Sequence, residues 1–501
     1  MKRIGLISFT LFALMLLSTS NISVVADTIP VKVVTPQQSN VLTIATRHDS
    51  IIYTAFAEEF AKSSYGQSVG ITDPSQVHFL TPTTFEAFYK AMTDPTFAVS
   101  LGWGGGPTLF NNLIAEGAVS PITDPTTVAA INDAVPDTLA GAEMKKFDDN
   151  GDMLWAANAI SSFGFTVNHD VLEARNLTVP KTWEDLASPD FFTNLAQPNV
   201  GMGNAPDTTS NTRIYQIILQ RYGWDRGWEI IYQMAANGKI YGGSVETRSS
   251  VIEGEVAAAM TIDFYGVIAM QENPRTEYIV PENASIVNGD PIAMAKNPAN
   301  PDAANAFLQF LFSKEGQSIW LRDNINRLPI REDAFDTPIG QTRPDIHDLY
   351  NRTLSNQGIE FNESLALSLE EPMRSHFEAT ITDVHTKHRN TWNLMIQGLR
   401  SGNLTEEKFE ELRKEFTKPA MTMEEAIAMN DQFLSDQSFQ RDKKKEWRDF
   451  ANSKLDSISN ELGGQGISDT QVTNVPYPSV GFIFAFLNLV MAIFITRKRK
   501  N

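Results

Sequence analysis

The chain has 501 residues, 42% of them hydrophobic and 20% charged, which is enough apolar material for two or three folded units. Its formal charge of -19 argues against a nucleic-acid partner, because pairing with phosphates needs a concentrated basic face. The sequence contains no cysteine, which excludes disulfides, thiolate metal sites and cysteine nucleophiles.

The N-terminus has the three parts of a secretory signal. Lys2 and Arg3 precede an apolar run over residues 4–17, and small residues then lead to Ala26. We predict a signal peptide over residues 1–26, cleaved after Ala26, since the apolar run is short for a membrane span. The alternative is an uncleaved N-terminal anchor.

Short β-branched runs alternate with amphipathic segments from residue 41 to about residue 338, a pattern typical of α/β domains. The runs predict strands over residues 41–46, 77–80 and 97–101, and the apolar spacing predicts helices over 51–61 and 84–92. Repeated strand-to-helix steps indicate a largely parallel sheet, whose ligands bind beyond the carboxyl ends of the strands.

A glycine-rich loop follows the third predicted strand, where residues 102–107 read Gly-Trp-Gly-Gly-Gly-Pro. Consecutive glycines let backbone N–H groups approach a ligand and can form a concavity that holds an anion. The competing interpretation is a tight turn between a strand and a helix.

After residue 338 the sequence becomes charged and mostly helical. Phe409, Leu412 and Phe416 share one face of a helix predicted over residues 405–416. We therefore predict that residues 339–462 form a helical extension.

Two groups of titratable side chains in this extension are interpreted as solvent-exposed. His385 and His388 could share a helical face, but the flanking Lys387 and Arg389 favour a solvated helix over a metal site. The three lysines at residues 443–445 are interpreted in the same way.

The C-terminus is predicted to anchor the chain in a membrane. Residues 463–479 contain glycine and proline without periodicity and are interpreted as a flexible stalk. Residues 480–496 form an uncharged apolar stretch of the minimum length for a transmembrane helix, and a basic tail over residues 497–501 follows. The positive charges place the tail in the cytoplasm, so the body is expected outside the cell, at its surface. The alternative is an internal amphipathic helix.

Several local sequences occur in the order and spacing of one family. They are the loop at 102–107, Phe-Gly-Phe-Thr-Val-Asn at 163–168, Thr-Trp-Glu-Asp-Leu at 182–186, Gly-Glu-Val-Ala-Ala-Ala at 254–259 and Ile-Asp-Phe-Tyr at 262–265. Together they resemble the extracellular solute-binding proteins of ABC transporters that bind ferric iron, thiamine, phosphonates or polyamines. These are type 2 periplasmic binding proteins, and the resemblance covers residues 41–330.

The resemblance implies two α/β lobes joined by two crossover segments, with the ligand between the lobes and closure about a hinge. Lobe one would comprise residues 41–159 together with 261–338, and lobe two residues 160–260. The crossovers would fall near residues 161–168 and 258–265.

Loops that follow strands are expected to line the cleft between the lobes. The candidate ligand-binding residues are Arg47, His48, Trp103, Gly104, Gly105, Thr209, Ser210, Asn211, Thr212, Asp263 and Tyr265. The hydroxyl-rich segment 208–212 precedes a predicted helix, whose N-terminal amides suit an anion. Structural roles compete with these assignments: core packing for Trp103, a surface ion pair for Arg47, pinning of the crossover for Asp263 and a plain helix cap for residues 209–212.

The family also implies a possible metal cargo. In its ferric-iron receptors a histidine and a pair of tyrosines ligate the metal, and His48 and Tyr265 stand at the corresponding places. Phe264 replaces the other phenol, which puts direct iron binding in doubt because Fe(III) favours several anionic oxygens. Trp103 could instead hold an organic ligand by stacking or by a cation–π contact.

We therefore expect a receptor that captures a small solute and delivers it to an ABC permease with a separate ATPase subunit, without catalysis. The chain has no HExxH, GxSxG or Walker motif, and no certain cofactor is implied. A small anion or an anion-chelated ferric ion ranks ahead of a polyamine. Anchoring suits a cell with one membrane, archaeal rather than Gram-positive because no lipobox cysteine is present. A surface sensor or adhesion module is the alternative, and a surface hydrolase is the least supported.

Overall fold

The computed structural model describes residues 40–82, 84–355 and 358–463. The predicted signal peptide (1–26), membrane helix (480–496), basic tail (497–501) and all of the predicted stalk after residue 463 lie outside the described residues. Within the part of the chain that is described, no helix is both long enough and apolar enough to cross a membrane.

The first group of strands is arranged around β1 (Leu42–Thr46). β1 pairs in parallel with β2 (Val77–Leu80) on one side and with β3 (Leu101–Trp103) on the other. The long strand β13 (Val287–Ala295) lies antiparallel to β3 and extends this part of the sheet. The strands predicted over residues 41–46 and 77–80 are confirmed.

The third predicted strand was placed too early in the sequence. Residues 97–101 were expected to be extended, but Pro95–Phe97 form a 3-10 turn that the Asp94 side chain caps through the Thr96 amide at 2.9 Å. Ala98 then adopts a left-handed backbone with a φ of 52°. The local cap outweighs the strand propensity of this run, and β3 begins only at Leu101.

A second group of strands is joined to the first by the long strand β8 (Met153–Asn168), which is buried along its whole length. Its first part pairs with β13, with Ser162 opposite Val287. Its last part pairs with β11 (Ala258–Ile262), with Val167 opposite Ala258. β9 (Val200–Gly203) and β10 (Gly238–Tyr241) complete the strand order β10-β9-β11-β8-β13-β3-β1-β2.

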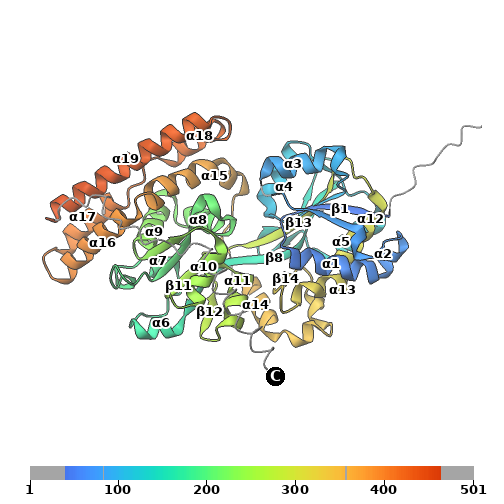
Figure 1. The fold of residues 1–501 in the computed structure, drawn as a ribbon, viewed down its shortest axis with the longest axis horizontal. Helices are drawn as coiled ribbons and strands as arrows, with labels where there is room; N and C mark the ends of the chain where they lie inside the picture. Colours follow the sequence, from blue (N-terminus) through green and yellow to red (C-terminus); the bar gives the residue numbers. More distant parts are fainter. Residues whose placement is uncertain (1–39, 83, 356–357, 464–501) are drawn as a thin grey trace, which may run out of the picture. The chain divides into compact units, whose positions relative to one another are not determined.

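Each group of strands has its own apolar core. The first core contains Phe56, Phe60 and Trp320, and the second contains Tyr215 and Trp228. The principal helices on these cores are α1 (Ser50–Lys62) and α12 (Pro301–Leu311) for the first, and α8 (Thr209–Tyr222) and α9 (Trp224–Ala236) for the second. The predicted two-lobed α/β fold is therefore confirmed, and Figure 1 shows β8 running between the two lobes. We call the part with the first core lobe one and the part with the second core lobe two.

The C-terminal region is helical, as predicted. Its helices are α14 (Pro344–Ser355), α15 (Glu363–Phe377), α16 (His385–Arg400), α17 (Glu406–Phe416), α18 (Met423–Ser435) and α19 (Gln437–Glu461). Phe409, Leu412 and Phe416 of α17 are buried together, as their spacing indicated. α14 packs on the core of lobe one, whereas Met373 and Phe377 of α15 belong to the core of lobe two. Figure 1 shows α15–α19 on the side of lobe two.

Of the two histidines of α16, His388 is buried and His385 is half-buried, so the prediction of a solvated helical face was wrong for them. Nε2 of His388 donates a hydrogen bond to the Tyr232 carbonyl at 2.8 Å, and Nε2 of His385 donates to the Ala235 carbonyl at 3.0 Å. Burial lowers the pKa of His388 to about 3 and that of His385 to about 4, so both are neutral at physiological pH and donate to these carbonyls. α16 packs between α9 and α19, which the local charges of Lys387 and Arg389 did not reveal.

Candidate functional site

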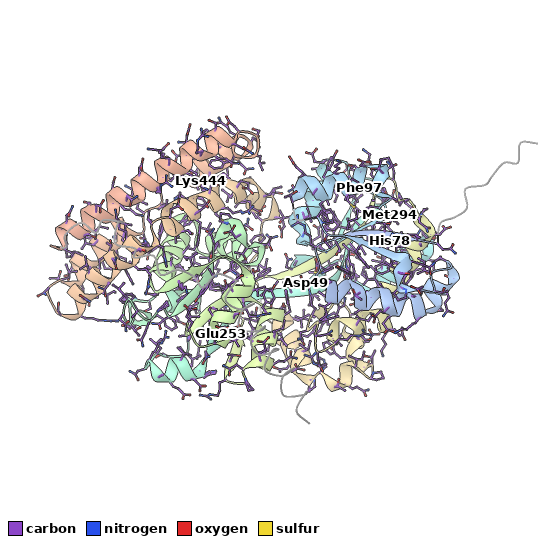
Figure 2. The ribbon with its side chains drawn as sticks, in the orientation of Figure 1. Asp49, His78, Phe97, Glu253, Met294 and Lys444 are labelled. Atoms are coloured by element: carbon purple, nitrogen blue, oxygen red, sulfur yellow. The ribbon has the colours of Figure 1, made fainter. Side chains whose placement is uncertain are left out.

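The end of β1 delivers Arg47 and His48 to one wall of the candidate site. The side chain of Arg47 makes no hydrogen bond or ion pair with any described residue, and its guanidinium lies 5.9 Å from the centroid of the Phe88 ring. Burial lowers the pKa of this guanidinium, which is half-buried. Asp49 follows at the start of α1 and is exposed (Figure 2). An unpaired cation in this position needs a partner that the described chain does not supply.

His48 lies beneath this position, in a network with Asp290 and Arg327. Its Nε2 atom is 3.6 Å from Oδ2 of Asp290, which also forms an ion pair with Nη2 of Arg327 at 2.9 Å. The His48 ring packs on Trp103 with the centroids 4.5 Å apart. Burial lowers the pKa of His48 to about 4, so the imidazole is neutral at physiological pH. A neutral imidazole can donate or accept a hydrogen bond.

The glycine-rich loop is a turn from β3 into α4 (Gly106–Ala115), and Gly104, Gly105 and Gly106 have positive φ angles. The Gly104 amide donates to the Pro291 carbonyl at 2.9 Å, and the Gly105 amide donates to Oδ1 of Asp290 at 3.1 Å. Both amides therefore already have partners, and a ligand would have to replace those bonds. Anion binding through Gly104 and Gly105 remains a prediction.

Trp103 is fully buried. Its ring packs against His48, Phe56 and Trp320, and its indole N–H donates to Oδ1 of Asn158 at 2.9 Å. In this arrangement no ring face is left exposed for a ligand. The structure shows a packing role, and contact between Trp103 and a ligand remains a prediction.

On lobe two, two helices begin with hydroxyl groups. Thr208 caps α8, and its hydroxyl lies within hydrogen-bond distance of Ser244, the first residue of α10 (Ser244–Ile252). Ser210 also meets Ser244, at 2.8 Å. Asn211 uses its side-chain oxygen to accept from the Gly203 amide at 2.9 Å, but its Nδ2 atom is buried without a partner among the described residues.

The other two candidates at the start of α8 differ in exposure. Thr209 is exposed, whereas Thr212 is buried and its hydroxyl donates to the Ala205 carbonyl at 2.7 Å. Thr212 is thus engaged in holding the turn that precedes α8. Ligand contacts by Thr209, Ser210, Asn211 and Thr212 remain predictions.

At the second crossover, Asp263 is buried and Tyr265 is only partly covered. Asp263 accepts hydrogen bonds from the Ser162 amide at 2.6 Å and the Phe264 amide at 2.7 Å, which pins this crossover to β8. Burial raises the pKa of Tyr265, and the neighbouring charges of Asp49, Arg248 and Arg327 also act on it. Tyr265 therefore lies among charged groups from lobe one and from lobe two, and its phenol keeps its proton at physiological pH.

Sequence reasoning missed Arg248 and Arg327. The Arg248 guanidinium lies 5.2 Å from the Tyr265 ring centroid and makes no hydrogen bond or ion pair with any described residue. Arg327 lies 5.2 Å from the Phe264 ring and bonds Ser161 as well as Asp290. Arg248 lies one helical turn after Ser244 in α10, a helix that follows the end of a strand. This position in the first part of such a helix could have identified Arg248 from the sequence. Arg327 precedes the short strand β14 (Leu328–Pro329) and carried no comparable signal.

Several of the candidate-site residues and their neighbours carry a buried polar atom without a partner among the described residues. These atoms are Nε of Arg47, Nε2 of His48, Nδ2 of Asn211, Nε of Arg248, Nε1 of Trp320 and Nε of Arg327, and seven further atoms of this kind lie elsewhere in the described part of the chain. Buried donors are nearly always paired in folded proteins, so a group of unpaired donors indicates a place where a bound molecule or water completes the bonds. All six are nitrogen atoms that can donate, which suits a ligand rich in acceptors.

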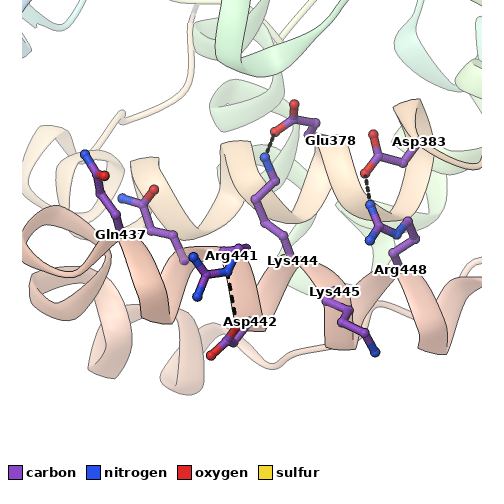
Figure 3. Close-up of a pocket in the computed structure, with 9 residues that line it drawn as sticks. Glu378, Asp383, Gln437, Arg441, Asp442, Lys444, Lys445 and Arg448 are labelled. Atoms are coloured by element: carbon purple, nitrogen blue, oxygen red, sulfur yellow. Dashed lines mark hydrogen bonds and ion pairs between the residues drawn. The ribbon is translucent and has the colours of Figure 1, made fainter.

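A hollow lies on the helical extension, between the π-helical turn Glu378–Thr382 and α19 (Figure 3). Its basic side chains already have acidic partners: Lys444 pairs with Glu378, Arg448 with Asp383 at 3.2 Å, and Arg441 contacts Asp442 at 3.5 Å. Lys445 is exposed, as predicted, but Lys444 is held by its ion pair. We therefore place the candidate site at the ends of the strands and not in this hollow.

Comparison with known proteins supports the same interpretation of the fold. A family model described as "Bacterial extracellular solute-binding protein" matches residues 99–347. The phosphoglycerate transport regulatory protein PgtC of Salmonella typhimurium, and that of Salmonella typhi, are each 27% identical over 183 residues, which is 36% of this chain and 44% of the relative. The match thus spans less than half the length of these curated relatives.

A solved structure shares the arrangement of the lobes. The spermidine/putrescine ABC transporter substrate-binding protein PotD from Streptococcus pneumoniae aligns with a TM-score of 0.50 and 16% identity, over 66% of this chain and 99% of PotD. Over the matched residues 99–347, this chain belongs to the family of bacterial extracellular solute-binding proteins, with the type 2 periplasmic-binding-protein fold.

Proposed function

We propose that this protein is the extracellular receptor of an ABC importer and that it captures a small anionic solute between its two lobes. The observation that carries the proposal is the pair of unpaired guanidinium groups, Arg47 on lobe one and Arg248 on lobe two. A half-buried arginine without a counter-ion is costly, and an anion that bonds both groups would remove that cost and draw the lobes together.

An organic phosphate is the solute class that these residues suit best. Guanidinium groups bond phosphate oxygens in pairs, and the hydroxyls of Ser210 and Ser244 add donors on lobe two. The curated relatives are named for phosphoglycerate transport, which agrees with this choice. A polyamine fits less well, because unpaired arginines would repel it.

A ferric ion held directly by His48 and Tyr265 is also less favoured. The raised pKa of Tyr265 disfavours the phenolate that Fe(III) prefers, and Phe264 offers no oxygen. A ferric ion chelated by an anion remains compatible with the arginines.

The remaining parts of the proposal concern the cell. A signal peptide over residues 1–26 would export the chain, and a helix over residues 480–496 would hold it at the cell surface with residues 497–501 in the cytoplasm. The cognate partners would be an ABC permease and its ATPase, and the protein would perform no catalysis. Loss of residues 480–501 should release the protein into the medium, and a protein that stays with the membrane fraction would contradict the anchor.

Titration calorimetry of the full chain tests the ligand class. The probes are 3-phosphoglycerate, inorganic phosphate, ferric citrate and spermidine. We expect a phosphate compound to bind, and Arg47→Met and Arg248→Met each to weaken it at least about tenfold through loss of a charged hydrogen bond. Arg221→Met is the matched control, because Arg221 is exposed on α8. Binding of spermidine alone, or binding that neither cleft variant changes, would overturn the proposal.

A further inference from the structure

Three side chains from three different parts of the chain meet at one point. Nη1 of Arg213, on α8 in lobe two, donates to Oε2 of Glu363 at 3.0 Å, and its Nη2 donates to the Thr108 hydroxyl at 2.7 Å. The Thr108 hydroxyl, on α4 in lobe one, donates in turn to Oε2 of Glu363 at 2.9 Å. We infer that this triad is a latch, supplied by the helical extension, that holds the two lobes closed.

The extension carries its part of the latch on lobe two. Gln220 of α8 exchanges hydrogen bonds with Asn362, donating to the Asn362 carbonyl at 3.1 Å and accepting from its amide at 2.8 Å. Gln216, one turn earlier, donates to the Ala366 carbonyl at 3.2 Å. These bonds run along the contact between α8 and α15, so α15 moves with lobe two. Glu363 also lies beyond residues 99–347, the segment that matches the family.

Thr108 is the arm of the latch on lobe one. It belongs to the first turn of α4, while Glu363 is the first residue of α15, so the carboxylate lies near two helix N-termini. The partial positive charge of both ends favours a carboxylate there. Hinged opening would carry α4 away from α8 and α15 and break both bonds of Thr108, while the ion pair of Arg213 and Glu363 would stay intact within lobe two and the extension.

The triad is partly buried, which strengthens its hydrogen bonds. Arg213 has 10% of its side chain exposed and Glu363 has 28%, and the Arg213 guanidinium stacks on the Phe361 ring at 4.7 Å. Both charged groups are thereby fixed before closure, so little side-chain freedom is lost when Thr108 arrives. The latch thus lowers the free energy of the closed state in the absence of any ligand.

The test measures the distance between the lobes in the full chain without ligand. Because the sequence has no cysteine, pairs of introduced cysteines can carry fluorophores. Glu86 on α3 (Phe85–Thr93) and Glu253 of lobe two are exposed and report the separation of the lobes. A second pair, Glu253 with Glu424 on α18, reports whether the extension leaves lobe two.

Thr108→Val removes the hydroxyl without changing the side-chain shape, and Glu363→Ala removes its partner. We expect each to shift the closed-to-open ratio about tenfold toward open, as for a charged hydrogen bond, while the second distance stays constant. Glu370→Ala is the matched control: Glu370 is on the same helix and is 31% exposed, but it bonds Gln216 and lies near Arg374. An unchanged lobe separation in Thr108→Val and Glu363→Ala would overturn the latch, as would an equal opening in Glu370→Ala.

Discussion

The carboxylate of Asp263 accepts a hydrogen bond from the backbone amide of Ser162 at 2.6 Å and thereby ties one crossover between the lobes to the other. Ser162 lies in the middle of β8, and Asp263 follows β11 directly. The predicted closure of the lobes would bend both segments, so we place this bond at the predicted hinge. Because the carboxylate is buried, its protonation state should affect the stability of the fold.

Asp263→Asn should remove a pH dependence of stability. Burial raises the pKa of Asp263 from 3.8 to about 6, so the folded state binds the proton more tightly than the unfolded state. The stabilisation of the folded state by protonated Asp263 is complete below pH 3.8 and is lost as the pH rises through 6. It amounts to at most about 3 kcal/mol of the free energy of unfolding. Urea titrations of both proteins at pH 4.5 and 7 measure it. Parallel pH profiles of the wild type and the variant would contradict the prediction.

The buried histidines of the extension should make it sensitive to acid. Burial lowers the pKa of His376 and of His388 to about 3, below the 6.5 of an unfolded histidine. The folded state therefore binds fewer protons, and stability is lost as the pH falls below 6.5. At pH 5 each histidine costs about 2 kcal/mol.

His388→Phe tests this acid sensitivity in α16. The imidazole of His388 stacks on the Phe416 ring with the centroids 4.4 Å apart, and a phenylalanine ring can stack there in the same way. Amide hydrogen exchange of α16 at pH 7 and pH 5 should show that the variant loses about 2 kcal/mol less protection than the wild type on acidification. Equal losses in both proteins would show that His388 is not the sensitive group.

Gly104→Ala should destabilise lobe one more than a comparable change elsewhere. Gly104 has a φ of 79°, and a Cβ there would lie 2.7 Å from Nε2 of His48. Gly402 has a φ of 75° with no atom within 4 Å, so Gly402→Ala carries only the backbone strain. The difference in free energy of unfolding should be about 1–3 kcal/mol, from displacement of the His48 ring. Thermal unfolding of the two variants measures it, and equal losses would mean that the ring moves freely.

Trp103→Phe separates packing from ligand contact. The change removes the hydrogen bond to Asn158 and part of the buried ring, and should cost about 2–4 kcal/mol of stability. Calorimetry with 3-phosphoglycerate should show an unchanged affinity if Trp103 acts only in the core. A large loss of affinity in a folded variant would instead support the stacking role predicted from the sequence.

The sequence determined those strands and helices whose apolar residues follow a regular spacing along the chain. The alternation in residues 41–46 and 77–80, and the single apolar face of residues 405–416, are properties of the chain itself, and the structure has strands and a helix there. The order of motifs also determined the family. The third strand was misplaced because the Asp94 cap and the left-handed Ala98 override the propensity of residues 97–100.

Tertiary structure alone decided which charges are buried and which side chains meet. His388 is buried because α16 is covered by α9 on one side and α19 on another, and local sequence does not say how many faces of a helix are covered. Arg47 and Arg248 are about 200 residues apart, and only the pairing of β8 with strands of both lobes joins the two parts of the chain that carry them, which are the parts that we propose to share one ligand. Thr108, Arg213 and Glu363 likewise form one triad because of packing between helices, which no spacing in the sequence encodes.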